Sequence, residues 1–165
     1  MRLLADFNAR MNRLLEYGVI VIFGIMTTVI FLQVIFRYGL EQSLSWSEEL
    51  ARYLFIWLTF LGASVAIREG THIRVTLAVD AIKHRATNLS LSLTANLLGI
   101  AFLYILMTKG VTVAMRVLAL EQISPTMEFL PIGVIYLAIP IGCFFMILNL
   151  LEQSYRQCTD LVHAR

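Results

Sequence analysis

Long apolar segments alternate with short charged ones along most of this 165-residue chain. A helix of about 20 apolar residues is long enough to cross roughly 30 Å of hydrocarbon. Segments of that length and character predict four transmembrane helices, over residues 17–36, 45–67, 86–108 and 129–151. The pattern therefore predicts an all-α integral membrane protein that forms a single domain over residues 1–165.

Composition supports a place in the bilayer. Hydrophobic residues make up 59% of the chain, charged residues only 15%, and the mean hydropathy is +0.78. These values are far more apolar than those of an ordinary soluble domain. The formal net charge of +2 and the absence of a run of Lys and Arg give no indication of a nucleic-acid partner.

Two segments beside the predicted spans are amphipathic. Residues 1–16 place apolar side chains at helical spacing between arginines, which predicts a short helix on the membrane surface. Residues 71–85 mix apolar residues with cations and predict a second interfacial segment, in which Arg74, Lys83 and Arg85 contact anionic lipid headgroups. The third helix keeps an apolar stripe as far as residue 122, and Pro140 is expected to kink the fourth span.

The second span has a dense polar and aromatic entrance. Ser45 followed by Glu48 forms a capping-box pattern, which predicts that the helix starts at Trp46. Glu48 and Arg52 have the spacing of an ion pair on one helix face, and Gly62 and Ala66 continue that face as a small-residue pair. We expect this face to pack on protein. The opposite face is bulky and aromatic and suits lipid or a large hydrophobic partner.

Orientation follows from the cations, which favour the cytoplasmic side. Nine of the 13 Lys and Arg residues lie in the N-terminal segment, the loop after the second span and the C-terminal tail, whereas four lie on the other side. Both termini are therefore expected to be cytoplasmic. The entrance of the second span then faces outward, with a collar whose members are Arg37, Trp46, Glu48, Glu49 and Arg52.

The apolar cores of the spans offer little for chemistry. They contain no Asp, Glu, Lys, Arg or His, whereas pumps and ion-coupled carriers place such groups near the bilayer midplane. This argues against a self-sufficient transporter, and no motif indicates an enzyme, a metal site or a cofactor. Glu48 and Glu49 are explained by capping and ion pairing or, alternatively, by docking of a partner protein. The polar residues inside the spans are expected to form hydrogen bonds between helices or to their own helix; they are Thr27, Thr28, Thr59, Ser64 and Asn96.

Several motifs resemble one known family. Arg37-Tyr38, the run from Trp46 to Glu49 and the run from His72 to Arg74 are similar to the signature of the small (DctQ-type) membrane subunit of tripartite ATP-independent periplasmic (TRAP) transporters. The resemblance covers residues 15–152. It implies three components: a soluble periplasmic protein that captures a carboxylate-containing solute, a large membrane subunit that moves the solute by a sodium-coupled elevator motion, and a small subunit that braces the large one.

Two functional classes remain. The first is a non-catalytic inner-membrane subunit in an obligate complex with the large subunit, anchored by lipid and touched at the collar by the binding protein. The second is an independent small channel or carrier that forms by oligomerisation. Transport by the purified chain alone would favour the second class.

Overall fold

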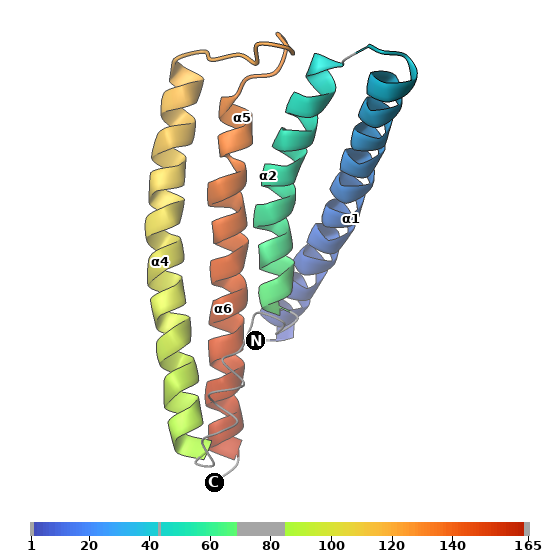
Figure 1. The fold of residues 1–165 in the computed structure, drawn as a ribbon. Helices are drawn as coiled ribbons and strands as arrows, with labels where there is room; N and C mark the ends of the chain where they lie inside the picture. The colour runs from blue at the N-terminus through green and yellow to red at the C-terminus, as the bar shows by residue number, and fades with distance from the viewer. Residues whose placement is uncertain (1, 43, 69–84, 164–165) are drawn as a thin grey trace.

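The computed structural model describes residues 2–42, 44–68 and 85–163 (Figure 1). It contains four long helices and one short one: α1 (Arg2–Gly39), α2 (Ser45–Arg68), α4 (Arg85–Ala119), α5 (Gly133–Tyr136) and α6 (Ala138–His163). Within the described part, four helical segments are long and apolar enough to cross a membrane: Arg10–Gly39, Ser45–Arg68, Leu91–Ala119 and Gly133–Thr159. The prediction of an all-α membrane protein with four spans is therefore confirmed.

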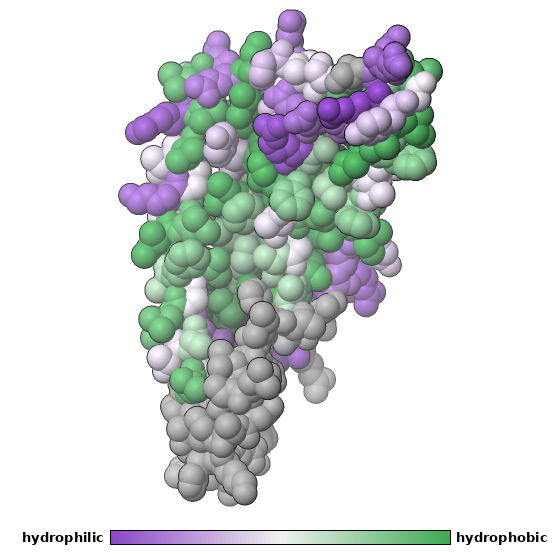
Figure 2. Space-filling view, viewed as in Figure 1, coloured by the Kyte–Doolittle hydropathy of each residue, from purple (hydrophilic) through white to green (hydrophobic). Residues whose placement is uncertain are grey.

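The helices stand side by side in the order α4, α6, α2, α1 (Figure 1). The loops from α1 to α2 and from α4 to α5 lie at one end of the bundle, which we call the collar end. The C-terminal ends of α2 and α6 point toward the opposite end, which we call the tail end. At the tail end, α4 and α6 extend beyond the end of α2 (Figure 1). Figure 2 shows hydrophobic residues over the middle of one face and many hydrophilic residues toward the collar end.

The core lies where α2, α4 and α6 meet. Its buried members are Ile67, Leu103, Cys143 and Met146. A close approach of α2 to α6 is possible because Gly142 has no side chain: a Cβ there would lie 2.6 Å from Cβ of Phe60. Small residues permit this contact between backbones in a bilayer, where the hydrophobic effect does not drive helices together.

Three helix boundaries differ from the predictions. Residues 2–16 do not form a separate surface helix, because α1 continues through them without a break. The third helix continues past residue 108 as predicted but ends at Ala119, where Glu121 adopts a left-handed conformation (φ 48°) that turns the chain out of the helix. The fourth span begins with α5 and is interrupted at Leu137, three residues before Pro140, whose ring cannot fit against a regular preceding turn.

Within this chain, the contacts of the two faces of α2 are the reverse of those predicted. Phe60 is half-buried against α6 and Ser64 is buried, so the bulky face forms the contact inside the bundle. Phe55 and Thr59 are exposed, and a Cβ at Gly62 would meet nothing within 4 Å. At Gly62 this face therefore has no neighbouring helix among the described residues. The helix also starts at Ser45 rather than Trp46, and the hydroxyl of Ser47 donates to the Leu44 carbonyl there.

Candidate functional site

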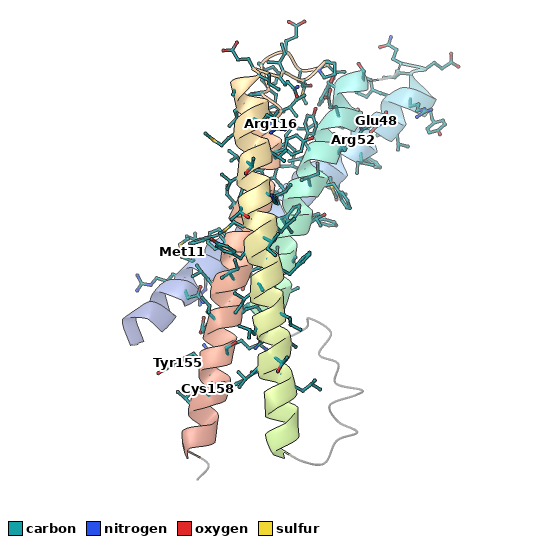
Figure 3. All side chains as sticks on the ribbon, turned by 90° about the vertical axis from the view of Figure 1, so that its left-hand side faces the viewer. Met11, Glu48, Arg52, Arg116, Tyr155 and Cys158 are labelled. Carbon is teal, nitrogen blue, oxygen red and sulfur yellow. The ribbon has the colours of Figure 1, made fainter. Side chains whose placement is uncertain are left out.

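The collar residues divide into an exposed group and a loop-binding one. Arg52 donates to Glu48 across 3.2 Å, as their spacing predicted, and both side chains are largely exposed. Figure 3 shows the pair near the collar end of α2. Arg37 in the last turn of α1 and Trp46 in the first turn of α2 are also exposed. Such a surface pair contributes little to stability, so these four side chains are available to other molecules.

Glu49 instead binds within the chain. Its carboxylate accepts hydrogen bonds from the hydroxyls of Tyr53 on α2 and Thr126 in the loop between α4 and α5. The contact with Thr126 joins residues that lie 77 positions apart in the sequence. Glu49 therefore ties the loop to the start of α2, a role that the sequence pattern alone did not reveal.

The loop of residues 120–132 is held by its own hydrogen bonds. The Ser124 amide donates to the Leu130 carbonyl, the Ile132 amide donates to the Gln122 carbonyl, and the Ser124 hydroxyl accepts from the Met127 amide. This ordered loop presents Phe129, whose exposed fraction is 82%. A large apolar side chain held out at the collar end is suited to contact with a partner or with lipid.

A groove of about 230 Å³ lies between α2 and the α5–α6 segment. Its lining is mostly apolar, with Arg52 and two tyrosines among isoleucines: Arg52, Tyr53, Ile56, Ile132, Ile135, Tyr136 and Ile139. It contains no nucleophile paired with a base, and no group of three His, Cys, Asp or Glu within the described residues could hold a metal ion. The groove can accept an apolar group.

A polar junction joins three helices toward the tail end. Asn149 of α6 donates to Asn12 of α1 and to the carbonyl of Ser64 on α2, both across 3.0 Å. Asn12 donates in return to Asn149, and Asn8 donates to Glu152 of α6. This junction was not predicted from the sequence, although Asn149, the single Asn inside the last apolar run, was a signal that could have indicated it.

Further hydrogen bonds join α4 and α6 toward the tail end. Asn96 donates to the Ser154 hydroxyl across 3.1 Å, and Ser92 donates to the Gln157 side chain across 3.2 Å. The predicted roles of the polar residues in the predicted spans are confirmed: Asn96 and Ser64 bond between helices, whereas the hydroxyls of Thr27, Thr28 and Thr59 donate to carbonyls of their own helices.

The predicted cytoplasmic lipid contact falls almost entirely outside the described residues. Arg74 and Lys83 lie in the segment between α2 and α4 that is not described, and Arg85 is the first residue of α4. The contact of these three cations with lipid stays a prediction.

Four apolar helices, polar side chains that join these helices and an exposed collar define a multi-pass membrane protein. Residues 26–160 match the model of the family described as tripartite ATP-independent periplasmic transporters, DctQ component. The chain belongs to this family.

Individual relatives agree with that assignment. The C4-dicarboxylate TRAP transporter small permease protein DctQ of Rhodobacter capsulatus is 33% identical over 116 residues, which are 68% of this chain and 49% of that protein. The sialic acid TRAP transporter small permease protein SiaQ of Vibrio cholerae is 25% identical over 87% of this chain and 81% of that protein. The isethionate TRAP transporter permease protein DctMQ of Oleidesulfovibrio alaskensis is 31% identical over 65% of this chain, but the match covers only 16% of that longer protein. The chain thus spans half or less of the length of two of these relatives.

Proposed function

We propose that this chain is the non-catalytic small membrane subunit of a TRAP transporter and works in an obligate complex with a large elevator-type subunit. The observation that carries the proposal is the family match over residues 26–160, together with polar side chains that join the helices to one another. A mobile transport domain needs a fixed frame, and a lipid-anchored bundle of apolar helices can enlarge that frame.

The large subunit is proposed to pack on the open face of α2. This face contains Thr59, whose hydroxyl donates to a carbonyl of its own helix, and Gly62, where an added Cβ would have no described residue within 4 Å. Ala66, one turn further on, is half-buried. Because small residues let a second backbone approach, this stripe suits a helix from another subunit.

The proposed orientation puts the collar end in the periplasm and both termini in the cytoplasm, within the bacterial inner membrane. Its support is the bias of cations toward the N-terminal segment, the second loop and the tail. A periplasmic binding protein would then meet the exposed collar side chains and the rigid loop that presents Phe129.

The transported solute is proposed to be organic, with carboxylates the first class to test, and its uptake is proposed to be coupled to sodium. The support is the resemblance to the family and the C4-dicarboxylate and sialic acid in the names of two relatives. Solute chemistry is assigned to the other two components, since the groove in this chain offers only an apolar lining with one arginine.

Co-purification tests the obligate complex. The chain is expressed with a large subunit of a TRAP transporter, extracted in a mild detergent and passed over a size-exclusion column. Elution of both chains in one stable peak is expected. Elution of this chain alone as a homo-oligomer that conducts or transports in liposomes would instead support the independent channel or carrier.

A further inference from the structure

The depth of α4 in the membrane can be read from its contacts with α5 and α6. Leu118 packs at Gly133 toward the collar end, Ile139 packs at Gly110, and Leu150 packs at Gly99 toward the tail end. Beyond Gly99 the contacts become hydrogen bonds, beginning with Asn96 and Ser154. The apolar part of this helix pair therefore ends near Gly99.

Charged residues on the other helices mark the same border between the apolar part of the bundle and its polar tail end. The apolar part of α6 ends at Glu152, which accepts a hydrogen bond from Asn8. The apolar part of α2 ends at Arg68, which pairs with Glu16 of α1 across 2.8 Å. A helix of about 20 residues that leaves this border at residue 97 reaches the opposite border near Arg116. A membrane-embedded part of α4 over residues 97–116, in place of the predicted 86–108, would match both borders.

This register places Lys109 inside the membrane, about 10 Å along the helix from Arg116 at about 1.5 Å per residue. Seven residues correspond to nearly two turns, so both cations lie on one stripe. Both side chains are exposed (Figure 3 labels Arg116). The stripe continues toward the tail end with Ile105, Phe102 and Leu98, the last two exposed by 65% and 67%.

Neither cation has a counter-charge in the described part of the chain. Helix α4 has no acidic residue, and the three ion pairs among the described residues involve neither Lys109 nor Arg116. The nearby hydroxyls of Thr108 and Thr112 donate to carbonyls of α4 itself. Because an unpaired ammonium at this depth is costly, an anion from another molecule would stabilise the stripe.

We propose that Lys109 and Arg116 bind the phosphate of an anionic phospholipid in the leaflet at the collar end, with an acyl chain lying along Ile105 toward the bilayer midplane. A lysine can extend its stem along apolar surface and direct its ammonium toward the headgroups, where the arginine already lies. A basic pair above an exposed apolar stripe is complementary to a lipid in both charge and polarity.

Native mass spectrometry of the purified chain tests this site. The chain is equilibrated with micelles containing phosphatidylglycerol or phosphatidylcholine, and the retained lipid is counted for wild type and for the Lys109→Gln/Arg116→Gln double variant. Wild type should retain phosphatidylglycerol in preference, and the double variant should bind it about tenfold or more weakly. Arg52→Gln is the matched control: this cation is exposed at the same end but is paired with Glu48, and its loss should leave retention unchanged.

Two results would overturn the proposal. One is equal retention of the two lipids by wild type. The other is a double variant that retains phosphatidylglycerol normally but no longer co-purifies with a second membrane chain, which would make the stripe a protein interface. Thermal melting of each variant separates loss of the site from loss of the fold.

Discussion

Asn12 on α1 and Asn149 on α6 donate a hydrogen bond to each other, with Nδ2 to Oδ1 distances of 2.9 and 3.0 Å. The two side chains are 1% and 4% exposed and lie 137 positions apart in the sequence. Asn149 also donates to Ser64, so one amide connects three helices. Since α1 otherwise packs mainly on α2, this pair fixes its tail end against α6.

Replacing either asparagine of this pair with leucine should destabilise the bundle. Asn149→Leu removes both hydrogen bonds between the Asn149 and Asn12 side chains, at a cost of about 1–2 kcal/mol in the free energy of unfolding. Because the residues interact directly, the double variant should lose less stability than the sum of the single variants. Unfolding in mixed micelles measures this coupling. Thr27→Val serves as control, since that hydroxyl bonds only to its own helix; strict additivity of the two asparagine variants would contradict the account.

Removing the carboxylate of Glu49 should loosen the loop between α4 and α5. Glu49→Ala deletes the acceptor of both the Thr126 and the Tyr53 hydroxyls, so amides within residues 120–132 should exchange with solvent several-fold faster. Hydrogen exchange followed by mass spectrometry measures this. Glu48→Ala, which breaks only an exposed ion pair, should leave the loop unchanged; equal protection in both variants would show that Glu49 does not hold the loop.

A side chain at Gly142 should separate α2 from α6. The new Cβ would lie 2.6 Å from Cβ and 3.0 Å from the carbonyl oxygen of Phe60, and the backbone cannot move aside without shifting a helix. Gly142→Ala is expected to cost about 1–3 kcal/mol in stability. The same change at Gly24, where nothing lies within 4 Å, should be neutral or slightly stabilising. Similar melting temperatures for the two variants would refute the close contact.

A large side chain at Gly62 should block assembly without harming the chain itself. A Cβ at Gly62 meets nothing within 4 Å among the described residues, so the isolated chain with Gly62→Leu should melt as wild type does. If the large subunit packs on this face, the variant should co-purify with it at least tenfold less well. Gly24→Leu on α1 is the matched control, because it adds the same side chain in open space on another helix. Normal recovery of the complex with Gly62→Leu would exclude this face as the interface.

The number and class of the helices could be predicted because length and hydropathy are the properties that a bilayer selects. Which face of α2 packs inside the bundle could not be predicted. In water a bulky apolar stripe turns inward, but in lipid the Phe60 stripe and the Phe55 stripe are equally well solvated, and the choice depends on Gly142 of another helix.

The candidate site was predicted in part for a related reason. Glu48 and Arg52 lie one turn apart on one helix, so their ion pair could be predicted from spacing alone. The partners of Glu49 and Asn149 lie 77 and 137 positions away, and only the assembled bundle brings them together. The register of α4 depends in the same way on Gly99 meeting Leu150.

Sodium-driven uptake tests the central claim, that this chain supports transport without performing it. Liposomes containing the large subunit, with and without this chain, receive the binding protein, a labelled carboxylate solute and an inward sodium gradient. Uptake is expected only when both membrane chains are present, and none with this chain alone. Full uptake by the large subunit alone, or uptake by this chain alone, would contradict the account.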